Sequence, residues 1–126
     1  MTEKDLSKYY KFRKEAEDLE NRLLEFGDGV KSNQIKDVVV SSSGVKMSIQ
    51  EQRQQLFDLY MEKRVSALEE CIKIERYIDS VDDPEIRTIM RTRFIDLKSW
   101  EEIGEIVHME RTAVSKKFRR YINAKQ

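Results

Sequence analysis

The chain has 126 residues, 38% of them charged, with one proline and four glycines. This length allows one domain, or a small domain with an extension, and the composition is typical of a mostly helical, coiled-coil-like protein. A single cysteine excludes an internal disulfide, and a single histidine argues against an ordinary zinc site of His and Cys. No apolar run approaches the roughly 18 residues of a membrane span, and no apolar secretory signal follows the charged N-terminus. We therefore expect a cytoplasmic protein that makes no membrane contact.

A helix is expected from about residue 4 to residue 26, because its apolar residues alternate at steps of three and four. This heptad seam needs a partner helix. Its members are Tyr9, Phe12, Ala16, Leu19, Leu23 and Phe26. Gly27 and Gly29 end the helix. The connection over about 28–47 is long for a compact domain, so we predict a flexible loop, with a short extended piece at 38–40 as the alternative.

A long helix is expected to begin after Ser48, because Ser48 and Glu51 have the spacing of a capping box. It can continue to about Ser80. Its apolar positions cover more than one two-helix seam, which indicates contact with more than one neighbour. The first helix, folded back as an antiparallel hairpin, is one candidate neighbour and a second subunit is the other. Cys71 lies on the apolar stripe, so we interpret it as a core residue rather than a nucleophile.

The next helix is expected at Pro84, since Asp83 can cap it and proline is favoured at the first helical position. Its apolar stripe continues toward the following element, and we expect Trp100 to anchor the core rather than stack on a base. The stripe and its extension contain Ile86, Ile89, Met90, Phe94, Leu97 and Trp100. Three arginines on the outer side could contact phosphates or only face solvent: Arg87, Arg91 and Arg93.

The segment 99–121 has the pattern of a short helix, a tight turn and a second helix. Gly104 sits four residues before the turn, where two steeply crossing helices need a small residue. The predicted core positions are Ile103, Ile106, Val107, Met109, Val114, Phe118, Tyr121 and Ile122. His108 occupies the turn, where its backbone is expected to be strained or its ring to cap the first helix. The exposed side of the second helix is rich in donors for phosphates and base edges.

The charges are segregated although the formal net charge is zero. Residues 84–126 contain ten Lys or Arg and six Asp or Glu, whereas residues 1–83 contain fourteen and eighteen. The last sixteen residues contain six basic side chains and no acidic one. A basic end on an acidic shaft is expected of a protein that meets a polyanion with one end.

The run from Asp82 to Val107, followed by Arg111 to Phe118, resembles the promoter-reading region four of bacterial sigma factors. More narrowly, it is similar to small phage and prophage regulators of the ArpU and RinA type. That resemblance implies a helical coil followed by a sigma-like helix-turn-helix associated with transcription of late phage genes, in the cytoplasm of a bacterial host. The sequence departs from the pattern at Glu110, where Ser or Thr is usual, and at His108, where glycine is.

The resemblance also implies a recognition helix that begins near Arg111 and enters the major groove of double-stranded DNA. The residues implied to face bases are Arg111, Thr112, Ser115, Lys116 and Arg119. Those implied to hold phosphates are Lys98, Ser99, Lys117 and Arg120. A homodimer through the N-terminal helices would double the small footprint of one module. The resemblance leaves a contact with RNA polymerase open.

The predicted fold is all-α, with an N-terminal antiparallel helical hairpin or coiled coil over 1–81 and a three-helix helix-turn-helix domain over 82–126. The predicted function is sequence-specific regulation of transcription. The alternatives are a DNA-packaging recognition subunit similar to a small terminase and a helix-turn-helix module that binds proteins. No enzymatic activity, cofactor or metal is expected, because the sequence has no phosphate-binding glycine loop, no His-based nucleophile pair and no metal-ligand cluster.

Overall fold

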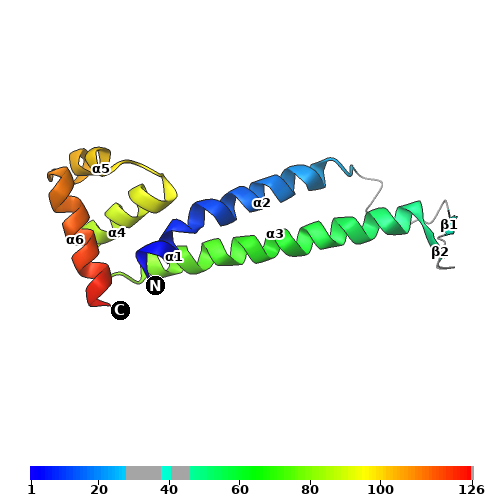
Figure 1. The fold of residues 1–126 in the computed structure, drawn as a ribbon, viewed down its shortest axis with the longest axis horizontal. Helices are drawn as coiled ribbons and strands as arrows, with labels where there is room; N and C mark the ends of the chain where they lie inside the picture. Colours follow the sequence, from blue (N-terminus) through cyan, green and yellow to red (C-terminus); the bar gives the residue numbers. More distant parts are fainter. Residues whose placement is uncertain (28–37, 41–45, 126) are drawn as a thin grey trace. The chain divides into compact units, whose positions relative to one another are not determined.

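The computed structural model describes residues 1–27, 38–40 and 46–125, and it confirms an all-α protein apart from two strands of three residues each. Figure 1 shows the elements in chain order. They are α1 (Glu3–Ser7), α2 (Tyr9–Leu24), β1 (Val38–Val40), β2 (Lys46–Ser48), α3 (Ile49–Asp79), α4 (Pro84–Met90), the π-helical η2 (Arg91–Ile95), α5 (Trp100–Val107) and α6 (Arg111–Ala124). Within these ranges, no helix combines the length and apolar character needed to cross a bilayer.

The chain divides into two compact units, and the division does not follow the boundary expected at residue 82. The first unit combines Met1–Arg13 with Glu69–Gln126, and the second is Lys14–Leu68. The reason lies in the core: Leu6 of α1 and Ile78 of α3 belong to the same buried cluster as Phe118 of α6. The N-terminus and the end of the long helix therefore belong with the C-terminal helices.

The core of the first unit is built from the apolar stripes of α3, α4, α5 and α6. Met90, Ile103 and Phe118 are fully buried, and burial of such side chains contributes about 1.5–3 kcal/mol each. The ring of Phe118 lies 5.4 Å from that of Phe94 and 5.8 Å from that of Trp100. The structure thus confirms Trp100 as a core anchor. It also confirms the stripe of the helix after Pro84, whose buried members are Ile86, Ile89, Met90 and Phe94.

The structure confirms the two helix starts that were predicted from a capping residue. Ser48 Oγ accepts a hydrogen bond from the Glu51 N–H at 2.9 Å, and Asp83 Oδ1 accepts one from the Glu85 N–H at 2.8 Å. The single helix expected over 4–26 is instead two helices, because the chain turns at Lys8 between α1 and α2. Neither glycine nor proline marks that turn in the sequence.

Two residues expected in the core are exposed. Leu97 is 54% exposed and Ile106 is 45% exposed. After α4 the helix widens into η2, where the Asp96 N–H donates to the Arg91 carbonyl and the Lys98 N–H to the Thr92 carbonyl, both at 2.9 Å. Leu97 then adopts a left-handed conformation with φ of 60°. This change of direction leaves Leu97 at the surface, and Ile106 lies on the outward side of α5.

The second unit joins the end of α2 to the first part of α3. The ring of Phe26 meets those of Phe57 at 5.8 Å and Tyr60 at 6.0 Å, edge to face. The Arg53 guanidinium donates to the Phe26 carbonyl oxygen at 3.1 Å. Gly27 follows α2 with φ of 67°, which confirms the predicted helix end.

The expected flexible loop over 28–47 lies partly outside the described residues, which omit 28–37 and 41–45. The described part contains the extended piece at 38–40 that was the alternative. β1 pairs antiparallel with β2, with Val39 opposite Met47.

Candidate nucleic-acid interface

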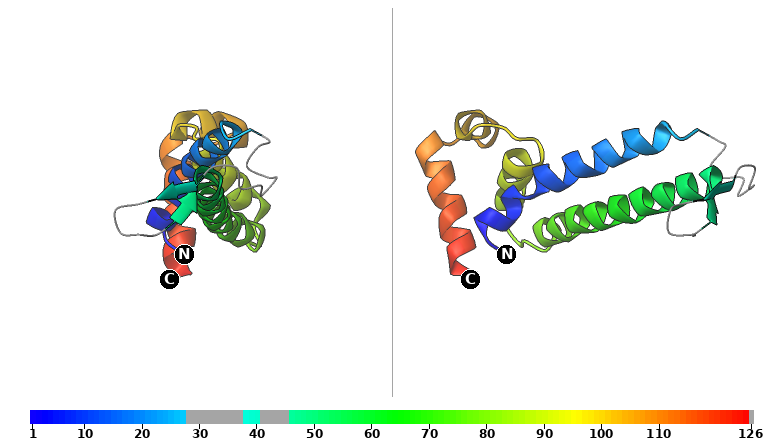
Figure 2. Two further views of the ribbon diagram at one scale, coloured as in Figure 1. Left: turned by 90° about the vertical axis from the view of Figure 1, so that its right-hand side faces the viewer. Right: turned by 45° about the vertical axis from the view of Figure 1, so that its right-hand side comes forward.

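The connection between α5 and α6 is a tight turn fixed by backbone hydrogen bonds. Ser99 Oγ caps the start of α5 by accepting from the Glu102 N–H at 3.1 Å. At the other end, His108 has φ of 59° and ψ of 47°, a left-handed conformation that costs a residue other than glycine about 1–2 kcal/mol. This confirms the strained backbone expected there. Glu110 begins α6 without a side-chain capping bond, and the two helices cross steeply (Figure 2).

Gly104 is required by the closeness of the turn. A Cβ built on this residue would lie 2.5 Å from the Met109 carbonyl oxygen, closer than real Cβ contacts. The Met109 N–H also donates to the Gly104 carbonyl at 2.9 Å. The predicted packing reason for this glycine is confirmed, since only a residue without a side chain allows the chain to return across α5.

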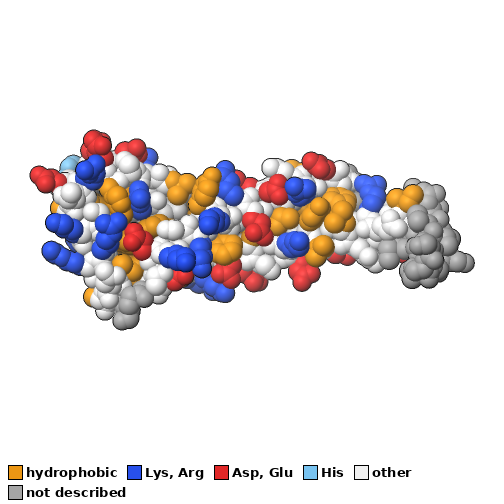
Figure 3. Space-filling view, viewed as in Figure 1, with side chains coloured by type: hydrophobic (Ala, Val, Ile, Leu, Met, Phe, Trp, Pro, Cys, Tyr) orange, Lys and Arg blue, Asp and Glu red, His pale blue; other side chains and the backbone are white. Residues whose placement is uncertain are grey.

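Helix α6 has one buried side and one exposed side. Val114 and Phe118 are fully buried and Ile122 is 2% exposed. With 3.6 residues per turn, the positions opposite this line are Thr112, Lys116 and Arg120. All three are exposed. In Figure 3, Lys and Arg side chains gather over α6. A shallow surface hollow follows the same side, lined by Met109, Thr112, Ala113, Lys116, Lys117 and Arg120.

The residues predicted to face bases are mostly accessible. Arg111, Thr112, Lys116 and Arg119 are exposed, whereas Ser115 is half-buried and its hydroxyl donates to the Thr112 carbonyl at 3.1 Å. Arg111 and Lys116 form no ion pair with any residue that the structure describes. The Arg119 guanidinium lies 3.8 Å from a carboxylate oxygen of Glu3, an exposed pair that contributes little.

Lys117, predicted to hold a phosphate, is instead engaged by two carboxylates of its own chain. Its ammonium donates to Glu85 and lies 3.7 Å from Asp83 Oδ2. The hydrogen bond with Glu85 and the charge of Asp83 raise the pKa of Lys117. A phosphate would have to compete with these carboxylates. No local sequence pattern predicts this pairing, because Lys117 and Glu85 are 32 positions apart.

The other residues predicted to hold phosphates differ in whether a group of the protein already engages their side chains. Lys98 Nζ lies 3.9 Å from Glu102, one turn further along the chain, and the Ser99 hydroxyl already serves as the cap of α5. Arg120 is exposed and forms no ion pair within the described part of the chain. Arg120 is thus the most accessible of the predicted phosphate donors.

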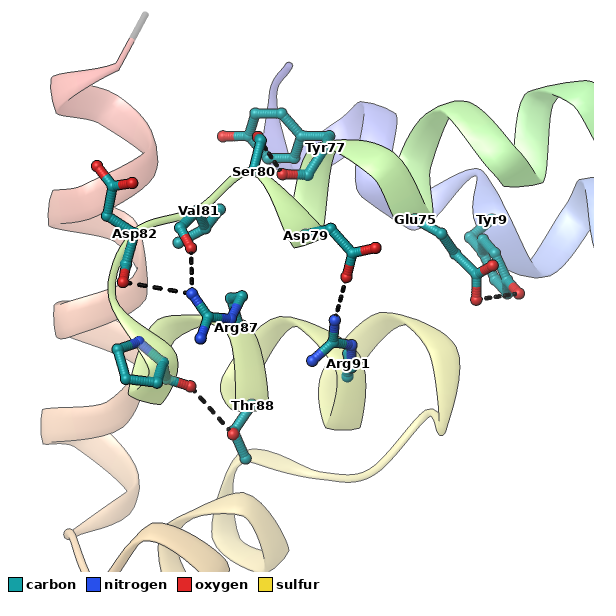
Figure 4. A network of polar contacts seen from close by, with 11 residues as sticks. Tyr9, Glu75, Tyr77, Asp79, Ser80, Val81, Asp82, Arg87, Thr88 and Arg91 are labelled. Atoms are coloured by element: carbon teal, nitrogen blue, oxygen red, sulfur yellow. Dashed lines mark hydrogen bonds and ion pairs between the residues drawn. The ribbon is translucent and has the colours of Figure 1, made fainter.

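Three arginines that the sequence placed either at phosphates or in solvent bond instead to groups of their own chain. The Arg87 guanidinium donates to the Val81 and Asp82 carbonyls at 2.6 and 3.3 Å, and Arg91 pairs with Asp79 (Figure 4). Arg93 donates to the Lys98 carbonyl at 3.0 Å, and its guanidinium lies 4.6 Å from the centre of the Trp100 ring. These side chains join the end of α3 and the loop before α5 to the helix between them.

Cys71 is confirmed as a core residue. It is 6% exposed, and burial raises the pKa of its thiol above the ordinary range. A raised pKa leaves little of the reactive thiolate near neutral pH.

Comparison with known proteins returned no match, whether with family models, curated proteins or solved structures. The resemblance to sigma region four therefore stays a prediction. The geometry of α5, the turn and α6 therefore carries the functional proposal.

Proposed function

We propose that the chain binds double-stranded DNA sequence-specifically and regulates transcription, with α5, the turn and α6 acting as a helix-turn-helix. One observation carries the proposal. Phe118 and Val114 lock one side of α6 into the core, while Lys116 and Arg120 on the opposite side are exposed without an ion pair to any described residue. Basic side chains that have no acidic partner, on a helix anchored in the core, can contact the phosphates and base edges of a major groove.

The exposed line on α6 offers suitable chemistry for reading bases. Lys and Arg donate to the O6 and N7 acceptors of guanine, and the methyl group of Thr contacts the methyl group of thymine. The spacing of Thr112, Lys116 and Arg120 supports placing all three toward the groove floor. Arg120 would then contact bases, in place of the phosphate contact that the sequence resemblance implies. Arg119 would lie beside this line, and Arg111 would lie at the exposed start of α6, where both can reach base edges or phosphates.

The wider proposal is a regulator of phage or prophage late genes whose N-terminal helices form an antiparallel hairpin and a homodimer. The phage context rests on the sequence resemblance. The dimer is supported by footprint size, because one module of this kind buries only about 600–1,000 Å² of protein surface on DNA. A contact with RNA polymerase remains part of this proposal only through the same resemblance.

The test is selection of duplexes from a random pool with the full chain, followed by fluorescence anisotropy on the selected and on scrambled duplexes at two salt concentrations. We expect Lys116→Ala and Arg120→Ala each to weaken binding to the selected duplex by about 1–3 kcal/mol. Lys63→Ala is the matched control, since it removes the same charge from an exposed position on α3.

Two outcomes of the binding experiments would contradict the proposal. One is no enrichment and no binding to duplex at low salt, which would favour a protein-interaction module. The other is an equal loss of affinity for Lys116→Ala and Lys63→Ala, which would mean that charge alone, and not the side of α6, governs binding. Light scattering that shows a ring of many copies would move the assignment to a packaging subunit.

A further inference from the structure

Helix α3 carries a second line of apolar residues that neither compact unit covers. Met61 is 37% exposed, Val65 47% and Ile72 44%, and Leu68 between them is half-buried. Their spacing is four, three and four residues. On a helix with 100° per residue, this line lies about 110° around α3 from the buried line that contains Ala67 and Cys71. We call Met61, Val65, Leu68 and Ile72 the outer seam.

The outer seam has the residue types of a parallel two-stranded coiled coil. In heptad terms, Val65 and Ile72 take position a, and Met61 and Leu68 take position d. Branched residues at a with leucine at d favour two parallel strands. The preceding a position is Asp58, which accepts a hydrogen bond from Gln54 at 3.0 Å. The following d position is Glu75, so the seam is two heptads long.

The charges beside the seam distinguish the two orientations of a partner helix. In a parallel pair, the g residue Arg64 of one copy faces the e residue Glu69 of the other. In an antiparallel pair, the e residues Glu62 and Glu69 would face each other with like charge. Neither Arg64 nor Glu69 forms an ion pair with a residue that the structure describes. Charge complementarity therefore selects a second copy in parallel orientation.

A hollow in the second unit extends the apolar surface at one end of the seam. Met61 and Arg64 line it together with Leu23, Leu24 and Phe57. Leu24 is 74% exposed. Figure 3 shows hydrophobic side chains gathered over α2 and the first half of α3. Side chains of a second helix on the seam would thus find apolar surface beyond the seam itself.

We propose that the outer seam binds the outer seam of a second copy, giving a parallel homodimer with an Arg64–Glu69 pair on each side. The inference deepens the proposed function, since parallel α3 helices end on the same side of the dimer and allow both copies to meet one duplex. The partner is this chain itself, and the orientation follows from the a and d residues and the flanking charges.

The first test measures the mass of the full chain without DNA, by sedimentation velocity. We expect the wild type to have twice the 15.0 kDa mass of one chain, and Val65→Lys to raise the dimer dissociation constant by at least about tenfold. Leu59→Lys is the matched control. Leu59 is 43% exposed on the same helix, about 150° from the seam, so this variant should remain dimeric. Circular dichroism should show equal helix content in both variants.

The second test addresses orientation. Arg64→Glu and Glu69→Arg should each weaken the dimer, and the double variant should restore it, because the exchange recreates opposite charges across a parallel seam. A monomeric wild type at about 100 µM would overturn the proposal, as would equal behaviour of Val65→Lys and Leu59→Lys. Failure of the double variant to restore the dimer would overturn the parallel arrangement. No DNA is present, so these failures are distinct from a failure of the DNA-binding proposal.

Discussion

Replacing Gly104 with alanine tests the turn on which the interface depends. Two effects oppose each other. Alanine in place of glycine within a helix favours the helix by about 1 kcal/mol. Against this, the added Cβ would lie 2.5 Å from the Met109 carbonyl oxygen, and a backbone atom cannot move aside as a flexible side chain can.

The expected net effect is destabilisation. Overpacking of this kind costs about 1–3 kcal/mol. Loss of the hydrogen bond from the Met109 N–H to the Gly104 carbonyl costs about 1 kcal/mol more, which offsets the gain in helix propensity. We therefore expect Gly104→Ala to lower the free energy of unfolding by about 1–3 kcal/mol. Affinity for DNA should fall as well, because a shifted turn moves α6 relative to α5.

The assay is urea unfolding followed by fluorescence of Trp100, the single tryptophan, which packs against Phe118 in the first unit. Glu105→Ala is the control. Glu105 is exposed on the same helix, so that substitution should change the free energy of unfolding by less than about 0.5 kcal/mol. If Gly104→Ala is as stable as the wild type, the close approach of the turn to α5 is wrong.

Two further predictions concern titratable side chains. Glu85→Gln removes the main partner of Lys117, so the affinity for nonspecific duplex should rise. In anisotropy titrations, the slope of log binding constant against log salt concentration should steepen by about one phosphate contact. An unchanged slope would show that Lys117 does not reach phosphate. Burial raises the pKa of the Cys71 thiol in the folded state above its unfolded-state pKa. The stability that the neutral, buried thiol contributes is therefore fully present below the unfolded-state pKa, and it is lost as pH rises toward the folded-state pKa. Urea unfolding between about pH 8 and pH 10 should show falling stability, with a shallower fall in Cys71→Ala, and equal slopes would contradict this origin.

The carboxylates around α6 bear on how such an interface would respond to DNA. Glu3 faces Arg119, and Asp83 and Glu85 face Lys117. These pairs are more than a third exposed, and exposed ion pairs contribute at most about 1 kcal/mol. Phosphates can therefore displace them. Because each of these cations must leave a carboxylate of its own chain before it binds phosphate, nonspecific DNA binding would be weaker than the number of cations on α6 suggests.

Features that depend on neighbours a few positions apart could be predicted from the order of the amino acids. Ser48 and Asp83 marked helix starts because a capping oxygen bonds an amide two or three residues on. Gly104 indicated the close approach at the turn, and the spacing of Val114 and Phe118 indicated the buried side of α6. Each of these signals acts within one or two helical turns, so it can be recognised before the fold is known.

Which distant elements share a core, and which charged side chains pair with each other, became clear only from the folded structure. Leu6 joins the core of the C-terminal helices, and Lys117 meets Glu85 across 32 positions. Leu97 leaves the core because η2 and a left-handed residue redirect the chain. These outcomes depend on the geometry by which separate helices meet, and a linear pattern of apolar and charged residues does not contain that geometry.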